Sequence, residues 1–234
     1  MNEEARAAFT SLSTATITMA LLKKGLRNVW LRRVRPLDPS APRVVGRAFT
    51  MRFVPGREDL ATPESLSSSK STRFAIEEIP PGSLAVVSSC GIIDAGIFGD
   101  ILCARMAVRK VGALITDGVM RDMDGVLATG LPVWCAGAAA PASVAGLTFV
   151  NWNEPVGCGG VAIFPGDIIS ADGDGAVVIP KAMLAEVAEQ AVEQERHEGW
   201  VIEEVRKGVP LPGLYPANAE NRARYEAWRK NQDR

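Results

Sequence analysis

The 234-residue chain is poor in the residue types on which many enzymes depend. It contains one histidine, His197, and four cysteines with no Cys-x-x-Cys pair. A single histidine excludes a multi-histidine metal site. It also leaves His197 as the only histidine that could activate a catalytic serine or cysteine. Any chemistry is therefore expected to depend on carboxylates, arginine and backbone amides.

The sequence also lacks a charge excess of either sign and an apolar run of membrane-spanning length. Lys and Arg number 26 against 27 Asp and Glu, so the formal net charge is -1. No positive field is available to hold nucleic acid non-specifically, and we expect neither nucleic acid nor a membrane as partner. Without a signal peptide, a reducing cytoplasm is the expected location, with all four cysteines as buried apolar thiols.

Short apolar segments separated by turns and amphipathic helices indicate an α/β fold with a sizeable core. Helices are expected from Ser13 or Thr14 to Gly25 and over 74–79, 100–110 and 181–207. Strands are expected over 44–54, 84–88, 113–116, 132–135, 160–163, 168–171 and 176–179. Because no repeat or linker divides the chain, the sequence predicts one domain over 1–215, followed by a polar tail or helix over 216–234.

Charged residues stand at the ends of two neighbouring elements in the middle of the chain. Asp100 opens a predicted helix directly after Gly99, where free backbone N–H groups favour an anion. Arg121 and Asp122 follow the strand over 113–116, so the three side chains are expected to converge. Carboxylates of this kind suit Mg²⁺, and the arginine fork suits a carboxylate or ketone oxygen. The alternative is that these residues are only caps and surface salt bridges.

Gly99-Asp100, followed after twenty residues by Arg121-Asp122, resembles the Asp-x20-Arg-Asp signature of the RraA-like family. The resemblance extends over about 13–208 and includes 14–18, 165–169 and 172–180. This family includes metal-dependent 4-hydroxy-4-methyl-2-oxoglutarate aldolases that also decarboxylate oxaloacetate. The resemblance implies a compact α/β/β swivelling-domain-like fold with a long C-terminal helix. It also implies a trimer or a dimer of trimers, with active sites between subunits.

The resemblance assigns a role to each residue of the central motif. Asp122 would be the direct ligand of Mg²⁺ or Mn²⁺, Arg121 would bind the keto-acid end of the substrate, and Asp100 would orient a water of the metal. The backbone at the start of the helix would receive the pyruvyl carboxylate, through Gly99, Ile101 and Leu102.

The implied activity is that of a class II pyruvate lyase acting on a small oxo acid. The metal and Arg121 would stabilise the pyruvate enolate left when the C3–C4 bond breaks, and aldol cleavage and decarboxylation share this enolate. Two alternatives stay open: an aldolase for a sugar-derived 2-keto-3-deoxy acid, and a non-catalytic regulator that binds a ribonuclease. The presence of Asp100 argues against the regulator. Met19 stands where many relatives have an acid, and the segment 57–73 is longer than in compact relatives. Both departures from the family pattern affect the choice of substrate more than the choice of metal.

Two acids of the predicted long helix, Glu195 and Glu198, fall within its apolar stripe. In the family, a glutamate of this helix reaches the metal-water shell of the neighbouring subunit, and the spacing before Gly208 favours Glu198. The alternative is that both acids pair with Arg or Lys. On the same helical wheel His197 points away from the apolar stripe. We therefore expect it to be exposed to solvent and to have no catalytic role.

Overall fold

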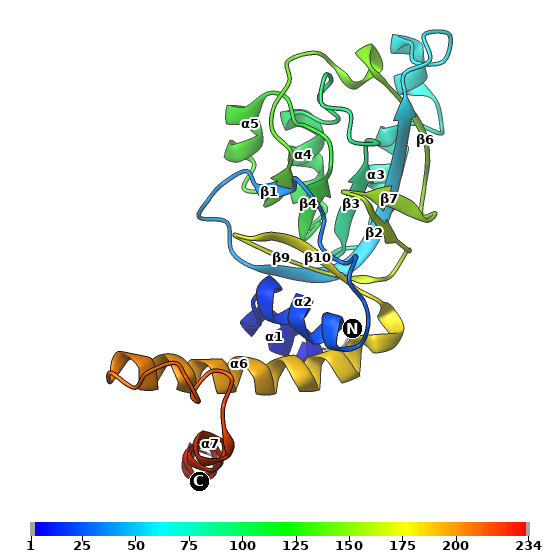
Figure 1. Cartoon of the computed structure of the whole chain (residues 1–234). Coiled ribbons are helices and arrows are strands. Elements are labelled where there is room, and N and C mark those ends of the chain that lie inside the picture. Colours follow the sequence, from blue (N-terminus) through cyan, green and yellow to red (C-terminus); the bar gives the residue numbers. More distant parts are fainter. Residues whose placement is uncertain (1–2, 233–234) are drawn as a thin grey trace.

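A strongly curved mixed sheet organises the chain (Figure 1). The computed structural model describes residues 3–232. In the described part the strand order is β1-β5-β4-β3-β2-β9-β10, with β6 paired to β2, and β7 and β8 form a separate pair. The strands are β1 (Arg35–Pro36), β2 (Val44–Pro55), β3 (Leu84–Ser88), β4 (Ala113–Thr116), β5 (Val133–Cys135), β6 (Leu147–Trp152), β7 (Val156–Cys158), β8 (Val161–Ile163), β9 (Ile168–Asp172) and β10 (Gly175–Ile179).

The long strand β2 joins the two halves of the sheet. Its first residues pair antiparallel with β9, and the stretch from Ala48 to Arg52 pairs parallel with β3. Strands β3, β4 and β5 continue this parallel pairing. Parallel strands end at the same edge of a sheet, so the loops that follow β3 and β4 emerge side by side. This edge carries the charged motif.

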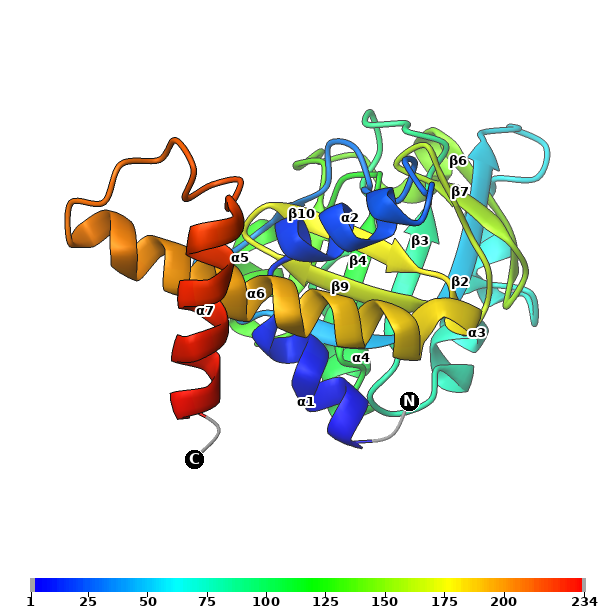
Figure 2. The ribbon, with the colours of Figure 1, turned by 60° about the horizontal axis from the view of Figure 1, so that its bottom comes forward.

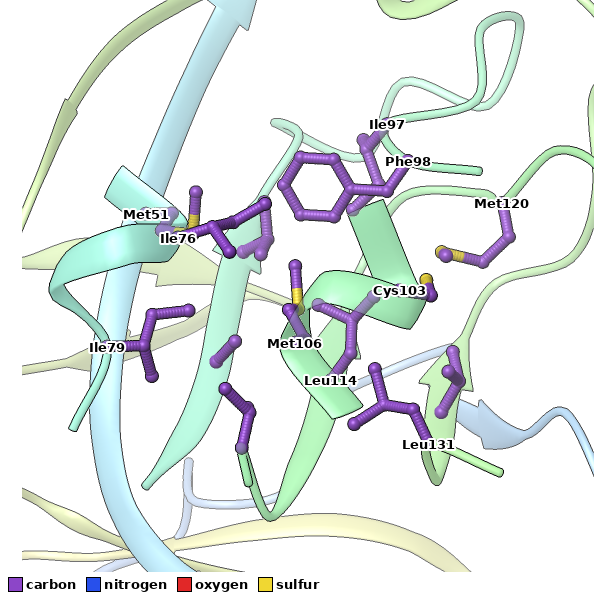
Figure 3. Packing of buried hydrophobic residues seen from close by; sticks show 14 of the residues in the cluster. Met51, Ile76, Ile79, Ile97, Phe98, Cys103, Met106, Leu114, Met120 and Leu131 are labelled. Atoms are coloured by element: carbon purple, nitrogen blue, oxygen red, sulfur yellow. The ribbon is translucent and has the colours of Figure 1, made fainter. Parts of the chain in front are cut away.

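One group of helices covers the parallel strands. It consists of α3 (Thr72–Glu78), α4 (Asp100–Val108) and α5 (Met123–Ala128). Apolar side chains of these helices, among them Ile76, Met106 and Val126, pack with Met51 and Leu114 of the sheet in one buried cluster (Figure 3). This packing fixes where α4 and α5 begin.

A second group of helices covers β9 and β10 on the opposite side of the molecule (Figures 1 and 2). It consists of α1 (Glu3–Ser11), α2 (Thr14–Lys23) and the long α6 (Leu184–Arg206). Ile17, Val177 and Val187 belong to its buried cluster. The last helix, α7 (Ala219–Gln232), packs on the end of α6 through a small apolar cluster.

Short 3-10 turns lie at Pro63–Ser67, Ser143–Ala145 and Lys181–Met183. In the described residues no helix is long and apolar enough to cross a membrane.

The α/β fold with a long C-terminal helix agrees with the sequence-based prediction, and most predicted elements lie within one to three residues of the observed ones. Five helices and strands of the described residues were not predicted: α1, α5, β1, β6 and β7. Helix α5 has only six residues and contains Gly125, and β6 is only partly buried along its length. Their periodicity is therefore too weak to detect.

Two expectations about single residues were wrong. Cys103, Cys135 and Cys158 are buried, but Cys90 is exposed. It follows the end of β3 in a left-handed conformation, with φ of 57°, which turns it out of the sheet. His197 is partly buried instead of solvated, because its ring packs at 4.8 Å from the ring of Tyr225 on α7.

The turn between β9 and β10 attaches α2 to the sheet. The Asp172 carboxylate accepts hydrogen bonds from the backbone N–H of Thr14 at 2.8 Å and from its hydroxyl at 2.7 Å. It also accepts one from the backbone of Asp174 at 3.0 Å. The indole of Trp134 donates to the Asp172 carbonyl at 2.8 Å. One residue thus links a helix, a hairpin and the far strand β5.

We predict that Asp172→Ala lowers the free energy of unfolding by about 2 to 4 kcal/mol, because it leaves the N–H and hydroxyl of Thr14 without their acceptor. Urea unfolding measures the change. Asp174→Ala is the matched control in the same turn, because within residues 3–232 only the backbone of Asp174 is hydrogen-bonded. It should change the value by less than about 1 kcal/mol. Equal losses in the two variants would contradict this role of Asp172.

Candidate active site

The charged motif lies where the loops after β3 and β4 meet. The Ile97 N–H donates to the Val119 carbonyl at 2.9 Å, and the Arg121 N–H donates to the Phe98 carbonyl at 3.0 Å. These bonds continue the parallel pairing beyond the strands, so Gly99 and Asp100 lie beside Arg121 and Asp122. The predicted convergence of the motif is therefore present in the structure.

Three glycines allow the two loops to approach this closely. A Cβ at Gly96 would lie 2.8 Å from Arg121 Cβ, and one at Gly99 would lie 2.5 Å from Asp122 Oδ2. A Cβ at Gly125 would lie 2.7 Å from Asp100 Cβ. Each acid therefore packs directly on the backbone of the other loop. Gly125 was not singled out in the sequence, although it stands only three residues after Asp122.

Asp122 has an unusual backbone conformation at the start of α5. Its φ of 54° and ψ of 48° lie in the left-handed region, which aspartate tolerates better than most residues but still at a cost of about 1 kcal/mol or more. Its Oδ2 accepts a hydrogen bond from Arg121 Nε at 3.1 Å, and the two side chains are 45% and 38% exposed. So exposed a pair contributes little stability, and both groups are accessible to a ligand.

Asp100 occupies the N-terminus of α4. Its Oδ1 accepts a hydrogen bond from the Ile101 N–H at 2.7 Å. The carboxylate of Asp100 itself therefore occupies the start of the helix, where free N–H groups favour an anion. A substrate carboxylate that used the Ile101 amide would have to displace that oxygen. The Ile101 side chain points outward and is 79% exposed.

Beneath Asp100 lies the thiol of Cys103. Burial, helped by the negative charge of Asp100, raises the pKa of Cys103 to about 12. The thiol is therefore protonated at neutral pH and is no nucleophile. Burial and the nearby Asp117 also raise the pKa of Cys158 well above its usual value.

A hollow of about 250 Å³ opens in front of the motif. Residues of the motif form one wall, and residues from the start of α3 and from the segment before β6 form the other. Its lining consists of Leu66, Thr72, Arg73, Gly96, Ile97, Phe98, Gly99, Asp100, Ile101, Leu102, Arg121, Asp122, Ala142 and Ser143. Arg73 is a charged residue of this site that we did not predict, since nothing in the local pattern marks it.

The oxygen ligands at the hollow fit a magnesium or manganese ion better than zinc. In the described residues, no three His, Cys, Asp or Glu side chains are grouped to hold a metal. Mg²⁺ needs no such group, because one or two carboxylates and several waters suffice. Asp122, with Asp100 nearby, offers that donor set.

Glu195 and Glu198 do not line this hollow. They belong to α6, which packs on α2 and lies on the other side of the sheet from α4 and α5 (Figure 1). The Glu195 carboxylate accepts a hydrogen bond from the Thr16 hydroxyl at 2.5 Å. The Glu198 carboxylate accepts one from Gln194 at 2.6 Å and one from the Tyr215 hydroxyl at 3.3 Å. Neither acid belongs to the site of its own chain.

The fold and the motif are those of an RraA-type α/β protein. The family model described as "RraA-like: Aldolase/RraA" matches residues 14–178, which is more than half of the chain. The chain belongs to the RraA-like family.

Individual relatives agree with this assignment. A protein of Halalkalibacterium halodurans, provisionally named 4-hydroxy-4-methyl-2-oxoglutarate aldolase, is 31% identical over 80% of this chain and 81% of its own length. The crystal structure of RraAS2 of Streptomyces coelicolor, described as an unusual member of the RNase ES inhibitor RraA protein family, is 32% identical. It superposes with a TM-score of 0.77 over 86% of this chain and 96% of its own. An uncharacterized protein from Pseudomonas syringae is 26% identical, with a TM-score of 0.79 over 92% and 98%.

We predict that Gly125→Ala lowers the free energy of unfolding by about 1 to 3 kcal/mol, because the added methyl group would overlap the Asp100 side chain. Gly199→Ala is the control, since Gly199 lies within α6 and no neighbouring atom of the described part of the chain lies within 4 Å of the position of an added Cβ. It should raise the value by about 0.5 to 1 kcal/mol. Chemical unfolding measures both, and a stabilising Gly125→Ala would show that the two loops are not in close contact.

Proposed function

We propose that this protein is a divalent-metal-dependent lyase of class II that cleaves a 4-hydroxy-2-oxo acid, of the 4-hydroxy-4-methyl-2-oxoglutarate type, to pyruvate. It would decarboxylate oxaloacetate at the same site. The observation that carries the proposal is the arrangement of Arg121, Asp122 and Asp100 around one small hollow. The provisional names of its relatives support an aldolase-like enzyme.

Each residue has a defined task in this reaction. Arg121 binds the C1 carboxylate or C2 ketone oxygen through its planar fork, with the start of α4 beside it. Asp122 would hold a Mg²⁺ or Mn²⁺ ion, which would supply Lewis-acid polarisation of the ketone. Asp100 positions the water that takes the proton from the C4 hydroxyl.

The bond changes are the same for both substrates. The C3–C4 bond breaks, and its electron pair moves to the C2 ketone oxygen, which gives the enolate of pyruvate. C4 leaves as a ketone or aldehyde from the aldol and as CO₂ from oxaloacetate. Pyruvate forms when C3 takes a proton. In the aldol reaction the proton comes from the water that accepted it from the C4 hydroxyl, and in the decarboxylation it comes from solvent water. In this proposal the guanidinium of Arg121 stabilises the negative charge that develops on the oxygen, and its effect is largest in the transition state.

We predict that the protein releases pyruvate from such acids with Mg²⁺ present, and that a chelator abolishes the release. Asp122→Ala should lower kcat/KM at least a hundredfold, because it removes the expected metal ligand. Asp124→Ala, an exposed acid two residues later, should retain activity within about threefold. A coupled assay with lactate dehydrogenase measures pyruvate.

Undiminished activity in Asp122→Ala would overturn the assigned site. No pyruvate from any 4-hydroxy-2-oxo acid, together with tight binding of a ribonuclease that Arg121→Ala leaves unchanged, would instead favour a non-catalytic regulator.

We also propose a trimer or a dimer of trimers in which α6 of one subunit supplies Glu198, or Glu195, to the site of the next. Two features support this proposal. The acids do not line the hollow of their own chain. Helices α4 and α5, which begin at the motif, expose the large apolar side chains of Ile101, Val108 and Leu127 by 79%, 72% and 46%, as helices at a protein interface commonly do.

We predict that a mixture of Asp122→Ala and Glu198→Ala chains, unfolded together and refolded, regains activity that neither variant has alone. Mixed oligomers then contain some sites with both residues intact. Sedimentation velocity provides the subunit number. A monomer, or no regain of activity from mixed oligomers, would contradict the supply of a glutamate in trans.

A further inference from the structure

Arg73 brings a second guanidinium to the hollow that contains the charged motif. It is the second residue of α3, and it lines the same space of about 250 Å³ as Arg121 and Asp122. Arg121 comes from the loop after β4 and Arg73 from the opposite wall. Two arginines from separate segments thus line the hollow, one next to Asp122 in the motif and one on α3.

The Arg73 guanidinium is fixed by a hydrogen bond, but its positive charge is not paired with a carboxylate of the described residues. Its Nη1 donates to the Leu66 carbonyl at 3.0 Å, and among the described residues it has no carboxylate partner. The nearby acids of the same helix are engaged elsewhere: Glu77 pairs with Arg105, and Glu78 accepts from Trp152. A guanidinium has five N–H donors, so most of them stay free for a ligand in the hollow.

Within one chain the charges that line the hollow cancel, because Arg73 and Arg121 balance Asp100 and Asp122. A divalent cation at the two acids would add two positive charges, and the glutamate proposed from the neighbouring subunit would offset one of them at the metal. Arg73 has no carboxylate of its own in the described residues, so it stays available to a second carboxylate of the substrate.

We propose that Arg73 is a specificity-determining residue that binds the second carboxylate of the substrate, the one attached to C4 of the aldol and away from the pyruvyl end. The segment 57–73 serves to present it. This inference rests on the proposed lyase function, and it selects a dicarboxylic oxo acid over a sugar-derived acid whose far end carries only hydroxyl groups. In a 4-hydroxy-2-oxo acid this carboxylate takes no part in the bond changes, so the effect of Arg73 is on binding. In oxaloacetate the corresponding group leaves as CO₂, so the role proposed for Arg73 applies to the aldol substrate.

Two unreactive acids of equal size test the inference without any turnover. 2-Oxoglutarate and 2-oxopentanoate differ only in the terminal group, a carboxylate in the first and a methyl in the second. With Mg²⁺ present, calorimetry should show that the wild-type protein binds 2-oxoglutarate 10 to 100 times more tightly. Arg73→Ala should reduce this ratio to less than threefold, and Arg73→Lys should give an intermediate ratio.

Lys70→Ala is the matched control. Lys70 is an exposed cation three residues before Arg73 that lines the adjoining cavity but not the hollow. It should keep the full ratio. An equal loss in Lys70→Ala would mean that the general positive field, and not contact with Arg73, attracts the second carboxylate, and would overturn the inference.

Kinetics separate a failure of this inference from a failure of the proposed function. For a dicarboxylic aldol substrate, Arg73→Ala should raise KM 10- to 100-fold and change kcat less than threefold, as expected for lost uniform binding. Pyruvate release with an unchanged ratio of affinities in Arg73→Ala would overturn the role of Arg73 alone. Absence of pyruvate release and of binding of either acid would overturn both.

Discussion

The arrangement of this site depends on the close contact between the loop after β3 and the loop after β4. Parallel pairing brings the two loops to one edge of the sheet, and the backbone hydrogen bond from Arg121 to Phe98 keeps them together. At Gly96 and Gly99 no side chain larger than hydrogen fits without displacing Arg121 or Asp122. The acids and the arginine are therefore positioned by backbone packing more than by bonds between their side chains.

This constraint explains why the site can consist of few, partly exposed groups. The Arg121–Asp122 pair is too exposed to contribute much to stability, and Asp122 is held in a left-handed conformation that costs energy. Such features are common where a chain preserves a geometry for a ligand. Stability comes instead from the buried clusters on both sides of the sheet and from links such as the one between Asp172 and Thr14.

The sequence was sufficient to predict those parts of the fold and site that depend on local order. Asp100 and Arg121-Asp122 follow recognisable helix and strand signals, so their convergence was predictable from parallel topology. Arg73 was not predictable, because the segment 57–73 has no periodicity and its position depends on contacts with distant residues. The exposure of Cys90 was missed for a related reason: a left-handed residue at the end of a strand leaves no pattern in composition.

The chain as a whole is nearly neutral, so its net charge does not attract a substrate. The charged residues that are grouped at the hollow would do so instead. Two arginines and two aspartates line a space large enough for a small acid and a hydrated cation, while α6 holds Glu195 and Glu198 on the other side of the molecule. A single chain thus has the substrate-binding half of the proposed site, and the proposed assembly would complete it.

A crystal structure of the protein soaked with Mg²⁺ and pyruvate tests the central claim most directly. The account predicts the metal on Asp122, with pyruvate between Arg121 and the amides of Ile101 and Leu102. Metal or pyruvate bound elsewhere, with the hollow unchanged, would contradict it.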